Sequence, residues 1–250
     1  MDKYIYSKSE LAWIGAYPSH WYIDRIKDKT TAVVGGDWGN DPDSDEEGNN
    51  VVVLRVADLN DIHFKYEDLT IRKIKDGSFK TRKVNERCLI IEKSGGGEKQ
   101  LVGRVGYPKN IDFDAISSNF MAKIEFDRTV DIEFMNFVFY NLYKRNLNYP
   151  YVQQTTGIQN LNVGYYLATK IAFPPINEQK IISDYLIKIW KQIERIKLLK
   201  FGTTKLSYDD NTENQIRILL QYRDSIIHEC VTGRKQVYSG EIKQKKEVNA

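Results

Sequence analysis

The side chains best suited to chemistry in this sequence are amides, hydroxyls and basic groups that carry hydrogen-bond donors and acceptors. A polar run at residues 153–156, Gln-Gln-Thr-Thr, precedes Gly157 and offers several such groups with little bulk. Arg and Lys suit guanine edges, whereas Asn and Gln suit adenine edges, so these residue types could read DNA bases. Contacts to phosphate would add affinity without sequence information. The candidate contact residues, which flank turn-rich segments, are Lys80, Arg82, Lys83, Lys93, Ser94, Arg104, Gln153, Gln154, Thr155 and Thr156.

Calcium binding is a weak alternative for the acidic segment. Asp41, Asp43 and Asp45 reproduce the first three ligand spacings of an EF-hand loop. Glu46 stands where that loop requires glycine, and Val52 stands where it requires a bidentate glutamate. We therefore expect a solvated acidic loop and no metal site.

Enzymatic signatures are also incomplete. Residues 148–151, Asn-Tyr-Pro-Tyr, are one residue away from the Asn-Pro-Pro-Tyr tetrapeptide of amino-group DNA methyltransferases, but residues 34–37 make a poor methyl-donor loop. Glu92 and Lys93 are adjacent and so point to opposite faces of a strand, unlike the acid and lysine of a nuclease core. The glycine triplet at residues 95–97 lacks the Lys-Ser/Thr sequel of a Walker loop. We expect no catalytic residues and no cofactor.

Composition and charge are those of a folded chain with an uneven charge distribution. The 250 residues are 41% apolar, carry a net charge of +3 and have a mean hydropathy of −0.51. Twelve basic and six acidic residues lie between Lys65 and Lys109, a balance compatible with a nucleic-acid partner. No apolar run approaches the roughly 18 residues of a membrane span, and two distant cysteines favour a reducing, cytoplasmic setting.

The elements that must position these residues alternate between short strands and helices. β-type runs cover residues 51–56, 89–92, 101–105 and 120–126, and a further strand is expected at residues 170–173. The apolar spacing of residues 132–145 predicts a helix. Residues 35–50 have the composition of a surface loop, and Asp76-Gly77-Ser78 that of a turn. The fold class expected is α+β, a mixed α/β domain with a twisted β-sheet followed by a long helical arm of coiled-coil type.

The helical arm follows a proline pair at residues 174–175. Asn177 is expected to cap it, and apolar residues then recur at alternating steps of four and three. These seam residues are Ile182, Leu186, Ile189, Ile193 and Ile196. A polar break at residues 202–214 precedes a second apolar stripe that runs to Cys230, with Gly233 as the expected C-cap. The seam must be covered either by the second helix or by another chain.

Four segments together resemble the specificity (S) subunit of type I restriction-modification enzymes. Residues 13–21 (WIGAYPSHW) resemble its W-x-G-x-x-P-x-x-W opening, and residues 88–97 (CLIIEKSGGG) its central strand and glycine loop. Residues 157–179 (GIQNLNVGYYLATKIAFPPINEQ) and 219–235 (LLQYRDSIIHECVTGRK) resemble the start and end of its spacer helices. The segments keep the family's order and cover nearly the whole chain.

The resemblance implies a half-length S subunit with one target recognition domain. That domain (residues 1–176) would read one half of a split DNA sequence. The arm (residues 177–235) would mediate dimerisation and dock methyltransferase subunits, and residues 236–250 would form a polar tail. The subunit would have no catalysis of its own, because S-adenosylmethionine and ATP belong to its methyltransferase and restriction partners.

Pairing of the seam with an identical chain is the preferred arrangement, because two-fold contacts are the commonest way to bury such a surface. The second half could also be another protein. Two other functions stay open, a small DNA methyltransferase remnant and a coiled-coil adaptor that binds only protein.

Overall fold

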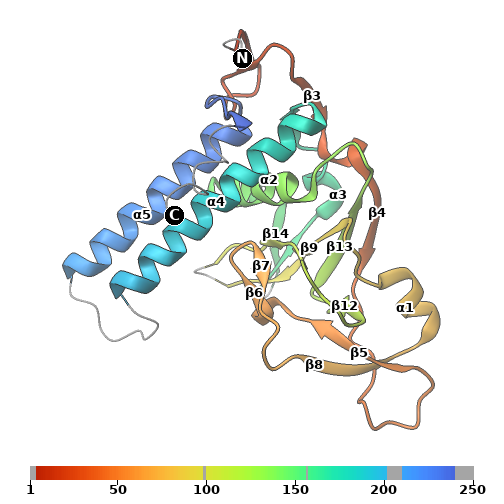
Figure 1. Cartoon of the computed structure of the whole chain (residues 1–250). Coiled ribbons are helices and arrows are strands. Elements are labelled where there is room, and N and C mark those ends of the chain that lie inside the picture. Colours follow the sequence, from red (N-terminus) through yellow and green to blue (C-terminus); the bar gives the residue numbers. More distant parts are fainter. Residues whose placement is uncertain (1–3, 98–99, 156, 202–209, 240–250) are drawn as a thin grey trace, which may run out of the picture. The chain divides into compact units, whose positions relative to one another are not determined.

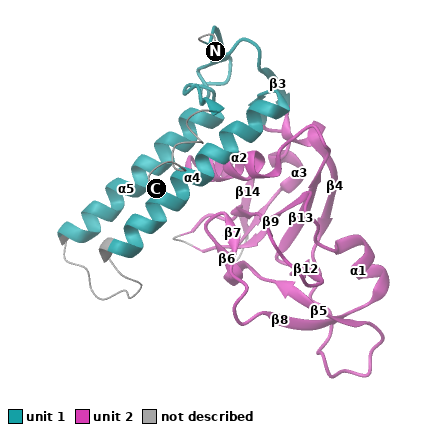
Figure 2. Ribbon diagram, viewed as in Figure 1, with its two compact units in different colours: residues 1–24, 170–250 teal, residues 25–169 magenta. Residues whose placement is uncertain are grey.

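The computed structural model describes residues 4–97, 100–155, 157–201 and 210–239 (Figure 1). The chain divides into two compact units (Figure 2). Unit 1 combines residues 1–24 with residues 170–250, and unit 2 comprises residues 25–169. The expected division at residue 176 therefore differs from the structure, because the N-terminal segment packs with the C-terminal helices.

The centre of unit 2 is an antiparallel sheet in the order β11-β9-β13-β4. Its strands are β4 (Thr30–Gly35), β9 (Cys88–Glu92), β11 (Val105–Gly106) and β13 (Met121–Phe126). Every residue of β9 is buried, as its apolar run predicts. Helix α2 (Ile132–Lys144) contacts β9 and β11, and the Asp131 carboxylate caps it by accepting from the Phe134 backbone N–H at 2.8 Å.

A second sheet, in the order β12-β5-β8, completes the core of unit 2. It contains β5 (Asn49–Leu54), β8 (Thr70–Ile74) and β12 (Ala115–Ser117), with β12 parallel to β5 and β8 antiparallel to it. The short hairpin β6 (Leu59–Asn60) and β7 (His63–Phe64) lies between β5 and β8 in the chain. Helix α1 (Asp76–Arg82) replaces the turn expected at Asp76-Gly77-Ser78, and it contacts β4 and β12.

A third, smaller sheet in the order β10-β15-β14 joins segments from the middle and the end of unit 2. Its strands are β10 (Ser94–Gly95), β14 (Val152–Thr155) and β15 (Ile158–Leu161). The polar run at residues 153–156 is typical of a loop, and a strand was predicted over residues 101–105. Instead β14 is a strand, and the latter segment contributes only Val105 to β11.

Unit 1 is built around two long helices, α4 (Ile176–Phe201) and α5 (Asp210–Val231), which contact each other as an antiparallel pair (Figure 1). Two short strand pairs complete it, β1 (Tyr6–Lys8) with β2 (Ala16–Pro18), and β3 (Tyr22–Arg25) with β16 (Lys170–Phe173). The Arg234 guanidinium donates to the Ile14 carbonyl at 2.8 and 3.1 Å. The Tyr4 backbone N–H donates to Gln236 Oε1 at 3.2 Å.

The predicted heptad seam is covered largely within the chain. Ile182, Leu186 and Ile193 are buried, and Ile189 is half-buried, because α4 packs beside α5 instead of presenting a bare apolar edge. Ile196, nearer the end of α4, is 41% exposed. The second helix therefore covers most of the seam, which is one of the two arrangements expected from the sequence.

The helix ends show one further correction and one confirmation. Helix α4 begins at Ile176, and the Pro175 carbonyl accepts from the backbone N–H groups of Glu178 and Gln179 at 2.8 and 3.0 Å. Asn177 therefore lies inside the first turn and is not the cap. Gly233 follows α5 with φ +76°, and a Cβ there would meet Pro18 Cδ at 2.2 Å, so the predicted glycine at this end is confirmed.

Candidate nucleic-acid interface

The sheet β10-β15-β14 brings together candidate residues that lie about 60 positions apart in the sequence. Ser94 pairs with Asn160 on β15, and Gly95 pairs with Gln159. On the other side of β15, Gln153 pairs with Asn160, and Gln154 pairs with Gln159. The structure thus places Ser94 and Gln153 on either side of the same residue.

The two faces of β15 differ in exposure. Ile158 and Asn160 are exposed, whereas Gln159 and Leu161 are buried, as alternation along a strand requires. The Ser94 hydroxyl donates to Asn160 Oδ1 at 2.8 Å, which orients this amide and leaves its NH₂ group as an outward donor. Gln153 is exposed beside it. Ser94, Gln153 and Asn160 therefore form a polar triad of hydrogen-bonding side chains on one face of the sheet.

Gln159 supports this face from behind. Its Oε1 accepts from the Val102 backbone N–H at 3.0 Å, and its Nε2 donates to the Gly97 carbonyl at 3.0 Å. Gly96 has φ +65°, and a Cβ there would lie 3.0 Å from Gln159 Oε1. Glycine at position 96 therefore lets the backbone close over the buried Gln159 amide.

Asn148 has a comparable role. It is fully buried, and its Nδ2 donates to the Val102 carbonyl at 2.6 Å. Gly103, with φ +108°, lies so close that a Cβ would meet Asn148 Nδ2 at 2.8 Å. The asparagine of the methyltransferase-like tetrapeptide is thus committed to holding the backbone of the neighbouring loop.

The other predicted contact residues are held elsewhere. Lys80 and Arg82 lie on α1 and Lys83 directly follows it, so the structure does not bring them to the sheet β10-β15-β14. Lys83 Nζ forms an ion pair with Asp114 at 2.7 Å. Arg104 Nε donates to the buried Glu92 carboxylate at 3.1 Å.

Three further sequence-predicted residues, Lys93, Gln154 and Thr155, lie at or beside the sheet. Lys93 immediately precedes β10, and its backbone carbonyl accepts from the Leu161 N–H of β15 at 2.8 Å. Gln154 is exposed on β14. Thr155 is the last residue of β14, and Thr156 lies outside the described residues.

A cleft of about 490 Å³ adjoins the sheet through Ser94 and Gly95. Trp38 and Phe120, which are 39% and 46% exposed, contribute aromatic surface to it, and Glu92 contributes a buried carboxylate. The cleft could not be predicted from the sequence, because its walls come from four separate segments. Sequence analysis also missed the hairpin β14-β15, although Gly157, with φ +88° between two short polar runs, is a recognisable hairpin signal.

The described residues contain no group of three or more His, Cys, Asp or Glu side chains placed to hold a metal ion. In the same residues no helix has the length and hydropathy needed to cross a membrane. The exposed face of β10-β15-β14 thus carries an amide, that of Asn160, held by the Ser94 hydroxyl.

The sequence model of the type I restriction modification DNA specificity domain matches residues 18–200, and the chain belongs to this family. None of the curated proteins compared with the sequence matches it.

Two solved structures have a similar fold. One, described as the structural basis of complex assembly and conformational transition of the type I R-M system, is 15% identical with a TM-score of 0.52, covering 87% of this chain and 47% of that one. The other, the HsdS subunit from Thermoanaerobacter tengcongensis, is 15% identical with a TM-score of 0.51, covering 92% of this chain and 49% of that one. The chain therefore spans about half the length of both proteins.

Proposed function

We propose that this chain reads one half of a bipartite DNA target as the specificity component of a type I restriction-modification system. The observation that carries this proposal is the convergence of Ser94, Gln153 and Asn160 on one exposed face of β10-β15-β14. Family membership supplies the class of protein, and the polar triad supplies a surface with suitable chemistry.

The sheet face suits the major groove of DNA. A two-stranded β-ribbon fits this groove, where adenine presents an N7 acceptor and an N6 donor to an Asn or Gln amide. The Ser94 hydrogen bond fixes the Asn160 amide before DNA arrives, which lowers the entropy lost on binding. Lys93, beside β10, would supply phosphate contact and salt-dependent affinity.

The helices α4 and α5 would serve assembly. α4 has 26 residues, or about 39 Å, which is of the order of the roughly 34 Å between half-sites one DNA turn apart. The exposed apolar side chains of these helices are Ile196, Leu198 and Leu199 towards the end of α4, and Ile218 and Tyr222 in the middle of α5. We assign these side chains to contact with a second copy of this chain. The methyltransferase subunits would dock on the resulting pair of chains, and the restriction subunit would join through the methyltransferase subunits. No part of this arrangement requires catalysis by the chain itself.

The test is Gln153→Ala, measured by selection from a duplex library with the methyltransferase subunit present. A base contact is worth about 1–3 kcal/mol of discrimination, so the variant should lose preference at one position of the site while its salt slope is unchanged. Gln192→Ala, an exposed glutamine on α4 and outside the sheet β10-β15-β14, is the matched control and should leave the preference unchanged. A uniform loss over all sequences would assign Gln153 to phosphate contact. Absence of any sequence preference in the unaltered chain would overturn the proposed function.

A further inference from the structure

The cleft beside the polar triad contains a buried charge that the proposed DNA-reading face does not use. Glu92, the last residue of β9, is 1% exposed and lines the cleft. Its Oε2 accepts from Arg104 Nε at 3.1 Å. Its Oε1 lies beside Gly95, where an added Cβ would approach to 3.7 Å, and accepts no hydrogen bond from any side chain or backbone group of the described residues.

A carboxylate that lines a cleft favours a ligand that brings a hydrogen-bond donor. A hydrogen bond to a charged group is stronger than a neutral one. A ligand N–H aimed at Glu92 Oε1 would make such a bond. Glu92 therefore selects for an amine, amidine or amide donor in the cleft.

The cleft walls favour a flat ring. Phe120 and Trp38 are the large aromatic side chains of its lining, and both keep more than a third of their surface exposed. The Phe120 carbonyl accepts from the backbone N–H groups of Lys93 and Ser94 at 2.9 and 3.1 Å, so this residue is tied directly to the β10 segment. The Arg72 guanidinium lies 5.1 Å from the centre of the Trp38 ring. Such fixed aromatic faces are the usual platforms for nucleobases.

We propose that this cleft binds one unstacked nucleobase that carries an exocyclic amine, with the amine donating to Glu92 Oε1 and the ring against Phe120. The inference rests on the proposed function, because Ser94 and Gly95 belong both to the DNA-reading sheet and to the cleft. A base inside a duplex cannot enter a cleft, so the occupant would be turned out of the stack or come from a single strand.

Cytosine and uracil provide the cleanest comparison, because both are pyrimidines and only cytosine has an exocyclic amine. We expect the full chain to bind (dC)₆ about tenfold more tightly than (dU)₆, as one charge-assisted hydrogen bond predicts. Quenching of Trp38 fluorescence would report occupancy, with Trp38→Phe as the control for the source of the signal. Equal affinity for the two oligonucleotides would overturn the proposal.

Two variants locate the binding site. In Glu92→Gln the amide oxygen can face Arg104 and its NH₂ group the cleft, so the preference should invert towards (dU)₆. Phe120→Ala should weaken both oligonucleotides by about tenfold, because stacking does not depend on the amine. Tyr149→Ala, an exposed aromatic outside the cleft, is the matched control. If Glu92→Gln does not fold, the affinities of Phe120→Ala and Tyr149→Ala for the two oligonucleotides are compared instead. Equal losses of affinity in these two variants would overturn the assignment of the cleft.

Further binding experiments identify the source of the base and distinguish failure of the cleft assignment from failure of the proposed function. Binding of dCMP as tight as that of (dC)₆ supports the same site with a free nucleotide as its occupant, whereas weaker binding supports a base within a strand. N-acetylarginine amide serves as a probe for a basic peptide. If it displaces (dC)₆ from the wild type but not from Phe120→Ala, the cleft is reassigned to a basic peptide and the proposal is overturned. Duplex selectivity without any preference for (dC)₆ would overturn the cleft assignment alone, and loss of both would overturn the proposed function as well.

Discussion

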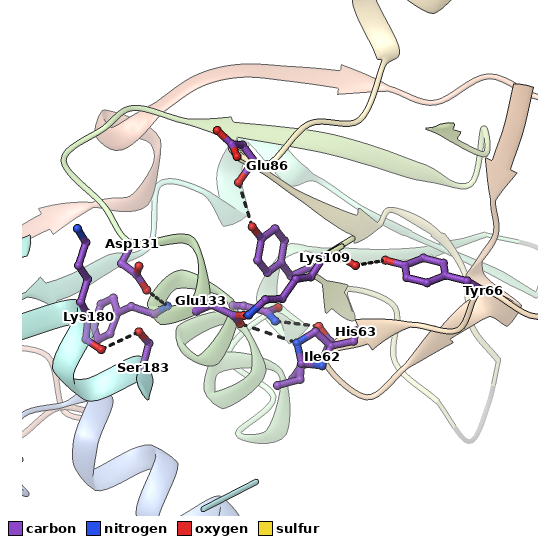
Figure 3. Close-up of polar contacts among 12 residues, drawn as sticks. Ile62, His63, Tyr66, Glu86, Lys109, Asp131, Glu133, Lys180 and Ser183 are labelled. Carbon is purple, nitrogen blue, oxygen red and sulfur yellow. Dashed lines mark hydrogen bonds and ion pairs between the residues drawn. The ribbon is translucent and has the colours of Figure 1, made fainter. Parts of the chain in front are cut away.

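Buried polar side chains determine the local geometry of unit 2. Gln159 and Asn148 each hold the backbone near Val102, and Asp131 caps α2. Glu133, in the first turn of α2, forms an ion pair with Lys109 at 2.5 Å and lies 3.8 Å from His63 Nε2 (Figure 3). Figure 3 shows His63 and Lys109 beside Glu133 in the first turn of α2, where a negative charge also interacts favourably with the helix dipole.

Glu133 gives a prediction about acid stability. Burial by itself raises the pKa of this carboxyl, but the hydrogen bonds and charges of His63 and Lys109 outweigh it and hold the pKa below its ordinary value of 4.5. The unfolded chain therefore binds this proton more tightly than the folded chain. The stabilising contribution is present above about pH 4.5 and is lost as the pH falls below it.

The measurement is the free energy of unfolding in urea for the wild type and Glu133→Gln between pH 3 and pH 7. We expect the variant to be less stable at neutral pH and the difference to shrink in acid. Glu86→Gln, at an exposed position, is the control and should follow the wild type throughout. A difference between wild type and Glu133→Gln that does not change with pH would contradict this account of the ion pair.

Sequence analysis identified the type of most candidate residues but not their partners. It selected Ser94 and Gln153, yet nothing in their local context shows that both pair with Asn160. Arg104 was selected for its charge, whereas the structure commits its Nε to Glu92. Tertiary pairing of this kind depends on strand register, which short polar segments specify weakly.

At the scale of elements, apolar periodicity was the reliable signal. The strand predicted at residues 170–173 coincides with β16, and the helix predicted at residues 132–145 ends one residue beyond α2. The errors occur where polar residues or glycine form regular structure. β14 reads Val-Gln-Gln-Thr and resembles a loop, and α1 contains Gly77, which disfavours a helix.

The pair α4–α5 contains one buried cation with a clear energetic role. Arg223 on α5 is 2% exposed, and its guanidinium lies 3.9 Å from the centre of the Trp190 ring on α4. Its Nη1 is 3.5 Å from Glu194. Truncation would remove the cation–π contact and the helix-to-helix ion pair together.

We expect Arg223→Ala to destabilise unit 1 by about 2 kcal/mol, since it removes a desolvated cation–π contact and the packing of a buried side chain. Thermal denaturation followed by circular dichroism at 222 nm would measure this as a lower melting temperature for the helices. Arg217→Ala, an exposed position on the same helix, should stay within about 0.5 kcal/mol of wild type. Similar melting temperatures for the two variants would show that Arg223 does not hold the helix pair together.

At the scale of the whole molecule, the division into units was predicted least well. Composition changes after Pro175, which suggested a boundary at residue 176. The structure assigns residues 4–24 to the helical unit. There Arg234 donates a hydrogen bond to the Ile14 carbonyl, and Gln236 accepts one from the Tyr4 backbone N–H. Contacts between positions more than 200 residues apart leave no local trace in a sequence.

Assembly with a second copy is testable through an exposed position. Leu199 is 74% exposed on α4, so Leu199→Asp should leave the folded chain intact but place a charge in the proposed contact. Analytical ultracentrifugation should show a dimer for the wild type and a monomer for the variant. Lys191→Gln, exposed on the same helix, should remain dimeric. A monomeric wild type would overturn self-pairing and favour a different protein as the second half.

The hydrogen bond between Tyr4 and Gln236 has a consequence for the engineering of this protein. Because an early residue and a late residue meet inside one unit, a short peptide bridge joining them would demand little rearrangement, and new ends could be opened at an exposed turn of unit 2. Circular permutants of this protein should therefore fold.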